Sequence, residues 1–173
     1  MPRDIVAADL AALNALNDAH AAEVNALAPA AFAALVRQAF AARMLDAPDG
    51  RPAGFCLALS HATPTQGPNH GWFQDRLPAF AYVDRVVVDA ACRGQGIARA
   101  LYADLVARAR AAGLPVLACE VNLDPPNPVS MAFHEKFGFT EAGIATDPRN
   151  GKRVRYLTLG LEHAAFIRTQ LVL

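Results

Sequence analysis

The sequence has no excess of charge of either sign. Lys and Arg together number 16 and Asp and Glu also number 16, so the formal net charge at pH 7 is +0. Nucleic-acid binding normally requires a basic excess, because phosphate contacts dominate that affinity. We therefore expect no nucleic-acid partner. No apolar run approaches the length of a membrane span, and the start, MPRDIVAADL, lacks the apolar core of a signal peptide, so we expect no membrane association.

Cysteine is also scarce. The three cysteines, Cys56, Cys92 and Cys119, are odd in number and form no CxxC pair, which indicates reduced thiols in an intracellular, cytoplasmic protein. The five histidines include no HExxH motif and no Cys/His cluster at zinc-ligand spacing. We therefore expect no metal site.

The remaining composition is typical of a globular protein. A chain of 173 residues with 54% hydrophobic and 18% charged residues is too apolar to be disordered and long enough to bury a core. No linker or internal repeat divides it. We interpret residues 1–173 as a single domain.

Hydrophobic periodicity predicts helices and strands in the order α, α, β, β, β, α, β, α, β, β, which is typical of a mixed α/β domain. The expected helices cover residues 7–19, a segment that starts after Pro29, and residues 97–112 and 127–138. The expected strands cover residues 40–46, 52–60, 79–89, 116–122, 139–145 and 154–161. An Asn-Gly pair at 150–151 favours a type I′ turn before the last strand.

Residues 60–79, SHATPTQGPNHGWFQDRLPA, show no period and are rich in turn-forming residues. We predict a loop, and a loop of this length inside a compact domain is usually functional or mobile. It contains the only tryptophan, Trp72, beside Phe73. Two interpretations stay open: the aromatic pair fixes the loop to the body of the protein, or it forms a wall of a substrate pocket.

The most informative stretch is VVVDAACRGQGIARALYADL, residues 86–105, where a β-branched run breaks into RGQG and then becomes helical. A strand that enters a helix through glycine-rich backbone presents free N–H groups, and the helix dipole favours negative charge there. Gly94 and Gly96 let a phosphate approach without a Cβ clash, and Arg93 adds a charged donor. The pattern indicates a pyrophosphate site. It is neither a P-loop nor a Rossmann fingerprint, because no GK[ST] follows and Arg99 stands where a third small residue is required.

Two motifs resemble those of the GNAT superfamily of N-acetyltransferases. Arg93, Gly96 and Ala98 meet the pattern [RQ]-x-x-G-x-[GA] of the family's acetyl-CoA loop. The segment NPVSMAFHEKFGF, residues 127–139, is similar to the second signature, N-x6-Y-E-K-x-G-F, with His134 in place of the tyrosine. The two motifs together are more specific than a single glycine-rich turn.

The resemblance covers residues 50–161 and the order of elements. It implies the GNAT-type acyl-CoA N-acyltransferase fold, a twisted mixed sheet flanked by helices and splayed near residues 86–88 and 120–122. Acetyl-CoA would be the co-substrate. Backbone groups of one strand end would bind its pantetheine arm, loop amides its pyrophosphate, and a helix side chain would add a contact. In that order, these residues are Val86, Val87 and Val88; Gly94, Gln95, Gly96, Ile97 and Ala98; and Asn127.

Acetyl transfer to an amine requires a base for the ammonium, donors for the oxyanion, and in some enzymes an acid for the leaving thiolate. The resemblance implies Glu120, in CEVN, as the base, although its spacing to Asn127 is longer than expected. His134 stands at the position of the usual tyrosine acid. A histidine with a pKa near 6.5 is a better acid than tyrosine at neutral pH. The alternative is a helix-face histidine held by its own hydrogen bonds.

Asp84 is the rival base, and it would also suit binding of a cationic amine. Its alternative role is an ion pair with Arg85 or Arg155. Neighbours on a strand face opposite sides, so only one of Asp84 and Arg85 should face the cleft. Tyr82 shares the side of Asp84 by the same period and is a candidate for lining the site.

We therefore expect an N-acetyltransferase that acts on a small amine, an amino acid or a peptide N-terminus by direct attack in a ternary complex. A covalent role for Cys119 is not favoured, since a cysteine in an apolar strand is typical of the core. The missing tyrosine keeps open an acyl-CoA-binding sensor or partner protein without turnover. An acyltransferase that uses a longer acyl chain, or an oxygen acceptor, is a further alternative. A homodimer also stays open, because many members of the resembled family dimerise, although no exposed apolar stripe in this sequence can be assigned to an interface.

Overall fold

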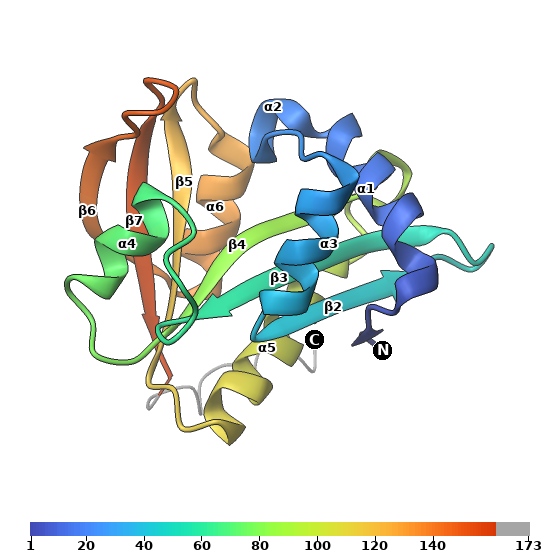
Figure 1. The fold of residues 1–173 in the computed structure, drawn as a ribbon, viewed down its shortest axis with the longest axis horizontal. Coiled ribbons are helices and arrows are strands. Elements are labelled where there is room, and N and C mark those ends of the chain that lie inside the picture. The colour runs from blue at the N-terminus through green and yellow to red at the C-terminus, as the bar shows by residue number, and fades with distance from the viewer. Residues whose placement is uncertain (162–173) are drawn as a thin grey trace.

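The computed structural model describes residues 1–161, whose elements alternate between helices and a single sheet (Figure 1). Their order is β1 (Arg3–Asp4), η1 (Ala7–Asp9), α1 (Leu10–Ala19), α2 (Ala21–Val24), α3 (Pro29–Gln38), β2 (Ala41–Asp46), β3 (Pro52–Ser60), α4 (Pro68–Gln74), β4 (Ala81–Val88), η2 (Ala90–Cys92), α5 (Ile97–Ala111), β5 (Val116–Asp124), α6 (Pro128–Phe137), β6 (Thr140–Thr146) and β7 (Arg153–Gly160).

The strands form a seven-stranded sheet in the order β1-β2-β3-β4-β5-β7-β6. Neighbouring strands are antiparallel except β4 and β5, which are parallel and are connected through α5. The mixed α/β architecture predicted from the sequence is thus confirmed.

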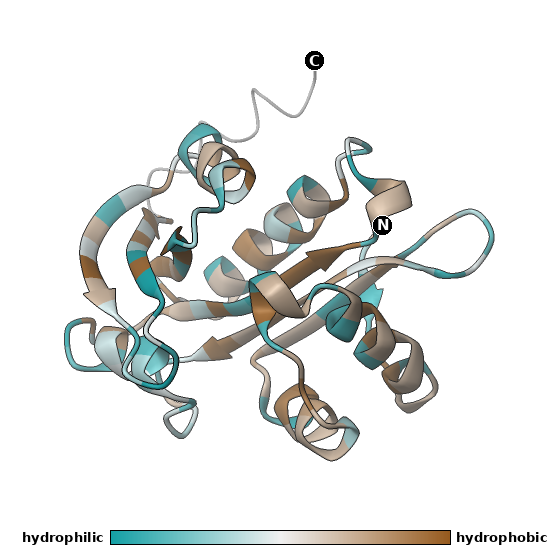
Figure 2. Cartoon of the chain, turned by 90° about the horizontal axis from the view of Figure 1, so that it is seen from above, coloured by the Kyte–Doolittle hydropathy of each residue, from teal (hydrophilic) through white to brown (hydrophobic). Residues whose placement is uncertain are grey.

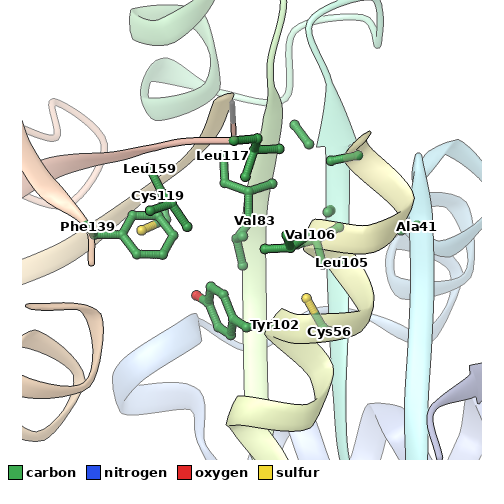
Figure 3. Close-up of a cluster of buried hydrophobic side chains, with 14 of the residues drawn as sticks. Ala41, Cys56, Val83, Tyr102, Leu105, Val106, Leu117, Cys119, Phe139 and Leu159 are labelled. Atoms are coloured by element: carbon green, nitrogen blue, oxygen red, sulfur yellow. The ribbon is translucent and has the colours of Figure 1, made fainter. Parts of the chain in front are cut away.

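Helices cover both faces of the sheet (Figure 2), and buried side chains form a separate hydrophobic cluster on each face. Helix α5 packs on one face, where Leu105 and Val106 contact a cluster that includes Val83 of β4 (Figure 3). Helices α1, α3 and α4 cover the other face, through side chains such as Leu13 and Phe32. The sheet is therefore buried from both sides, and a site can open only at an edge or a break in the pairing.

Such a break occurs in the middle of the sheet. Strands β4 and β5 pair only at Ala81 with Leu117 and at Tyr82 with Ala118, although β4 continues to Val88 and β5 to Asp124. Figure 1 shows β5, β6 and β7 turning away from β2, β3 and β4 beyond this contact. The expected splay is confirmed, and it opens a gap between two parallel strands.

The sequence analysis was wrong about part of residues 60–79, because helix α4 occupies Pro68–Gln74. The helix begins with proline at its first position, where the missing N–H is not needed. Seven residues are too few to show a helical period among so many glycines and prolines. Strand β1 and helix α2, of 2 and 4 residues, were also missed.

The predicted type I′ turn is wrong as well. That turn needs left-handed backbone at both central residues, and in the β6–β7 loop Gly151 has a φ of 71° whereas Asn150 is not among the positive-φ residues. The loop instead spans four residues between Asp147 and Lys152, which are joined by the Asp147 N–H to Lys152 C=O hydrogen bond of 2.8 Å. The Asp147 carboxylate accepts from the Arg149 N–H at 2.9 Å, so a local side chain organises this loop.

Helix ends near the gap agree with the sequence. The Asn127 side chain caps α6 by accepting a hydrogen bond of 3.1 Å from the Ser130 N–H, and Pro128 follows it. Gly138 ends this helix with a φ of 106°, and Gly113 follows α5 with a φ of 70°. These caps fix the helices that flank the splayed strands.

Candidate active site

A cleft of about 1390 Å³ lies where β4 and β5 separate. Single small-molecule pockets usually measure roughly 300–1,000 Å³, so this cleft has room for two ligands side by side. Most residues singled out from the sequence line it. They are Tyr82, Asp84, Val86, Val87, Val88, Arg93, Gly94, Gly96, Ile97, Ala98, Glu120, Asn127 and His134. Gln95, Trp72 and Phe73 do not.

One half of the cleft is formed by the loop before α5. Gly94 and Gly96 both have a φ of +76°, a left-handed conformation that strongly favours glycine, and a Cβ at either position would have no atom within 4 Å. The first hydrogen bond of the helix runs from Ala100 N–H to Gly96 C=O at 2.9 Å. Within residues 1–161, no backbone carbonyl accepts from the amides of residues 94–98. Open space beside unpaired amides at a helix start is the geometry of an anion site.

The side chains of this loop brace it from outside. Asp89 accepts a hydrogen bond of 2.9 Å from the Ala91 N–H, and the Gln95 amide donates back to the Ala91 carbonyl at 3.1 Å. Arg93 is exposed and lies 3.3 Å from His20, measured between Nη2 and Nδ1. The Gln95 side chain is thus turned away from the cleft, and only its backbone remains available to a ligand.

The second contribution to this half is the edge of β4. Residues Val86 to Val88 pair with β3 on one side, but on the other side they do not pair with β5, which has diverged from β4. Backbone polar groups on such an edge need partners. An extended ligand laid along the edge can supply them, as an added strand does.

The other half of the cleft centres on Glu120 in β5. Its Oε2 accepts a hydrogen bond of 2.7 Å from the Tyr82 hydroxyl, and its Oε1 accepts one of 3.0 Å from the Asn69 amide nitrogen. The Asn69 amide oxygen in turn accepts from the Tyr156 hydroxyl at 3.0 Å. Strands β4, β5 and β7 and helix α4 therefore converge on one carboxyl group.

This environment changes the acidity of Glu120. Burial raises its pKa to about 7, the Asp84 charge acts in the same direction, and the hydrogen bonds from Tyr82 and Asn69 partly oppose the rise. Burial and the nearby Glu120 charge raise the pKa of Tyr82 well above its usual value, so Tyr82 stays a donor. A carboxyl group with a pKa near neutrality is suited to accept a proton at physiological pH.

Asp84 and Arg85 do not face opposite sides, so that expectation was wrong. Leu57 pairs with Arg85 and Ala58 with Val83, which leaves Asp84 as the extra residue of a β-bulge. A bulge breaks the alternation of side chains. Both residues line the cleft, and Arg85 Nε donates to Asp84 Oδ2 at 2.8 Å.

The Asp84–Arg85 ion pair is also held by a side chain of helix α1. Arg85 Nη1 donates to the side-chain oxygen of Asn17 in α1 at 2.7 Å. Arg155, the other partner considered for Asp84, is instead bound to Glu141 at 3.0 Å. Asp84 is therefore committed to Arg85, whereas Glu120 has only neutral hydrogen-bond donors.

His134 lies in the cleft wall and is 3% exposed. Its Nδ1 is 2.7 Å from the Ser130 carbonyl and its Nε2 is 2.7 Å from the Tyr102 hydroxyl. A carbonyl can only accept, so Nδ1 carries the proton and Nε2 accepts from Tyr102. Burial lowers the pKa of His134, which keeps it neutral. In this arrangement both ring nitrogens are occupied.

The aromatic pair of residues 60–79 fixes α4 to the sheet. Phe73 is fully buried in the core, and Trp72 stacks on Tyr156 with ring centroids 4.2 Å apart. This segment contributes Thr65, Gln66, Gly67 and Asn69 to the cleft lining, and Asn69, which contacts Glu120, was missed by sequence reasoning. No local signal marks Asn69, because its partner Glu120 is 51 residues away.

Residues beyond these close the cleft on the Glu120 side. The sequence analysis did not single out Asp147, Arg149 and Lys152 of the β6–β7 loop, and all three line the cleft.

Across residues 1–161, no helix has the length and apolar character needed to cross a membrane. The same range holds no group of three or more His, Cys, Asp or Glu side chains placed to bind a metal ion.

Comparison with known proteins identifies a family. The model of the acetyltransferase (GNAT) family matches residues 11–139. No curated protein sequence matches the chain.

Similar solved structures share the fold. The ribosomal-protein-S18-alanine N-acetyltransferase of Escherichia coli has a TM-score of 0.69 at 19% identity, over 93% of each chain. Naa20 of Chaetomium thermophilum, in complex with a bisubstrate analogue, has a TM-score of 0.74 at 16% identity, over 96% of this chain and 89% of that one. The NatC complex bound to Gag peptide and CoA has a TM-score of 0.70 at 15% identity, over 92% and 97%.

Proposed function

The chain belongs to the acetyltransferase (GNAT) family, and from this premise we propose that it moves the acetyl group of acetyl-CoA to a primary amine. The observation that carries the proposal is the position of Glu120. A carboxyl group whose pKa is raised to about 7 lies in the cleft between the splayed strands, beside an anion site. That combination provides a base next to a place for a phosphorylated acyl donor.

The residues of the β4 edge and the following loop fit acetyl-CoA. Its pyrophosphate would be held by the amides of residues 94–98 with help from Arg93, and its extended arm by the backbone of residues 86–88. Asn127 would contact it from the start of α6 while capping that helix. The open space above Gly94 and Gly96 supports this placement. Acetyl-CoA, when bound, supplies an acetyl thioester.

Glu120 would accept the proton that the ammonium must lose before it can attack. The neutral amine nitrogen would then form a bond to the acetyl carbon as the carbon–sulfur bond breaks with its electron pair on sulfur. The surplus proton of the new amide nitrogen would pass to water or to the departing CoA thiolate. Tyr82 and Asn69 hold the carboxylate in one orientation through bonds of 2.7 and 3.0 Å. Asp84, bound to Arg85, would shape the field around the amine and is the weaker candidate for the base.

The hydrogen bonds of His134 bear on the leaving group. The neutral ring has its only N–H on the Ser130 carbonyl, so His134 as it stands has no proton to give the thiolate. We propose that the thiolate leaves without a proton from His134, and that the ring positions Tyr102 and α6. Burial raises the pKa of Cys119 well above its usual value, so this thiol stays protonated, which favours direct attack over a cysteine-bound intermediate.

Two of the solved structures agree with this chemistry by their ligands. One contains a bisubstrate analogue, and another contains CoA with a peptide. At 16% and 15% identity they inform the fold of this chain and leave its acceptor to experiment.

The test is a calorimetric titration of acetyl-CoA into the purified protein, with CoA and ATP as separate titrants. We expect binding of both CoA species and weak or no binding of ATP. A thiol-release assay over a panel of amines, from pH 6 to 9, follows. Amine-dependent release that rises through pH 7 supports the enzyme. Tight acetyl-CoA binding without amine-dependent release would instead favour a sensor without turnover.

A further inference from the structure

The β6–β7 loop, residues 147–152, reaches across the Glu120 side of the cleft. The Lys152 ammonium donates to the Ala22 carbonyl at 3.2 Å and to the Asn25 side-chain oxygen at 3.3 Å. These bonds join the loop to the α2 segment, more than 120 residues earlier in the chain. The side chains of this loop that line the cleft are therefore held in place across it.

Within this loop, Arg149 is fixed in one orientation. Asp147 is 3% exposed, and its carboxylate binds the Arg149 guanidinium through Nε at 3.0 Å and Nη2 at 2.7 Å. The hydrogen bond and charge of Arg149 lower the pKa of Asp147, so the carboxylate remains ionised across the neutral range. One edge of the guanidinium is thus occupied by a buried partner, while the side chain itself is 53% exposed.

The Nη1 group of the guanidinium lies beside Gly67, the residue before α4. A Cβ added to Gly67 would lie 2.5 Å from Arg149 Nη1, so the guanidinium rests against the backbone of Gly67. Asn69, two residues later, donates to Glu120. The Glu120 charge also contributes to a raised pKa of Arg149. Arg149, Gly67, Asn69 and Glu120 all line the same cleft.

Arg149 Nη1 has no hydrogen-bond acceptor among the residues that the structure describes. A guanidinium whose Nε edge is held by a buried carboxylate can still bind a second carboxylate through its Nη1 and Nη2 edge. We propose that Arg149 recognises a carboxylate on the acceptor, so that the acceptor is a free amino acid with its amine toward Glu120. This inference rests on the proposed acetyl transfer.

Charge complementarity favours a zwitterion over other amines. Asp147 and Asp84 already form ion pairs with Arg149 and Arg85, and Lys152 adds a further positive charge within the same loop. A polyamine would bring two or more positive charges, and apart from Glu120 the cleft carboxylates without an arginine partner, Glu23 and Glu135, lie on α2 and α6 rather than on the loop that carries Arg149. A peptide N-terminus lacks the α-carboxylate of a free amino acid, so only an acidic first or second side chain could take its place. A free amino acid supplies one positive and one negative group.

The experiment compares amino acids with their amides, which keep the amine and the side chain but lose the carboxylate. Thiol release from acetyl-CoA is measured with both sets for the wild type and for Arg149→Gln. The matched control is Arg51→Gln, because Arg51 also binds a carboxylate two residues before it in a hairpin turn, outside the cleft. Acetyl-CoA titration of each variant confirms that the fold and the cofactor half persist.

We expect the wild type to prefer at least one amino acid over its amide by roughly tenfold to a hundredfold in kcat/KM, the range for a hydrogen bond to a charged group. Arg149→Gln should remove that preference mainly through KM, Arg149→Lys should restore part of it, and Arg51→Gln should leave it unchanged. Equal use of amides, better use of peptides, or a preference that survives Arg149→Gln would overturn the inference and leave acetyl transfer intact. If none of the amines tested supports thiol release, the proposed function is overturned, and this inference with it.

Discussion

The two halves of the cleft differ in which groups face a ligand: backbone groups in one half and side chains in the other. The half before α5 consists of the backbone of one continuous stretch, residues 86–98, with its amides and two left-handed glycines. The half around Glu120 consists of side chains that come from β4, α4, β5 and the β6–β7 loop. A backbone site tolerates most substitutions because nearly every residue supplies the same N–H. A side-chain site depends on each donor, so substitutions there should be felt one at a time.

The largest effect is expected at Glu120. Glu120→Gln removes the base and keeps the size of the side chain, so kcat should fall by roughly 10²–10⁴. The part of the activity that rises with pH through about 7, as Glu120 loses its proton, should disappear. Acetyl-CoA affinity, measured calorimetrically, should not change. The control is Glu141→Gln, an exposed glutamate on β6; an unaltered pH profile in Glu120→Gln would transfer the role of base elsewhere.

In the half of the cleft that contains Gly94 and Gly96, substitution should lower acetyl-CoA affinity, the quantity that Glu120→Gln leaves unchanged. Gly96→Val places a β-branched side chain at a φ of +76° in the space proposed for the pyrophosphate, so acetyl-CoA affinity should fall by roughly tenfold to a hundredfold. Gly113→Val is the matched control, since Gly113 has a φ of +70° with equally open surroundings outside the cleft. Both variants should lose about 1–2 kcal/mol of stability from strain. Similar affinities in the two variants would remove residues 94–98 from the cofactor site.

The donors to Glu120 should tune its pKa. Tyr82→Phe removes a hydrogen bond that favours the ionised carboxylate, so the pKa of Glu120 and the midpoint of the pH–activity curve should both move upward from about 7. Turnover at pH 7 should consequently fall a few-fold, with recovery at higher pH. Tyr156→Phe breaks only the bond to Asn69 and should give a smaller shift. A downward shift in Tyr82→Phe would contradict this account of the carboxyl group.

The smallest effect on turnover is expected at Tyr102. Tyr102→Phe leaves the buried Nε2 of His134 without a donor, which should lower the free energy of unfolding by about 1–3 kcal/mol in urea titrations. Turnover at saturating substrate should change less than threefold, because neither group is proposed to deliver the proton. A large loss of turnover with unchanged stability would instead make the Tyr102–His134 pair part of the chemistry.

The same contrast between the two halves explains what could be predicted from sequence. Arg93, Gly94 and Gly96 lie within four consecutive residues, so a local pattern reveals the turn and the chemistry of its amides. The role of Glu120 and the splay of the sheet were both expected from the resemblance to the GNAT family. These features need no knowledge of distant contacts.

The remaining features depend on tertiary structure. The bulge at Asp84 reverses the side-chain alternation, and no residue type in AYVDRVVV marks where it occurs. Helix α4 is too short to show a period, and its residue Asn69 acquires a role only when β5 lies beside it. His134 was identified as a position, but its protonation state follows from Tyr102 and Ser130, which pack around it in the folded chain.

The short contact between β4 and β5 has a mechanical consequence. The sheet has two halves, one made of β1, β2, β3 and β4 and the other of β5, β7 and β6. The halves pair directly at only two residue pairs and then diverge, so the two pairs act as a hinge point. The hinge point includes Ala81 and Ala118, both fully buried. A methylene added to either alanine would displace the two strands slightly at this point, and the displacement would grow along β4 and β5 and change their separation at Val88 and Asn122. The width of the cleft therefore depends on packing at two of the smallest side chains in the protein, one of which pairs with Tyr82 and lies two residues before Glu120 on β5.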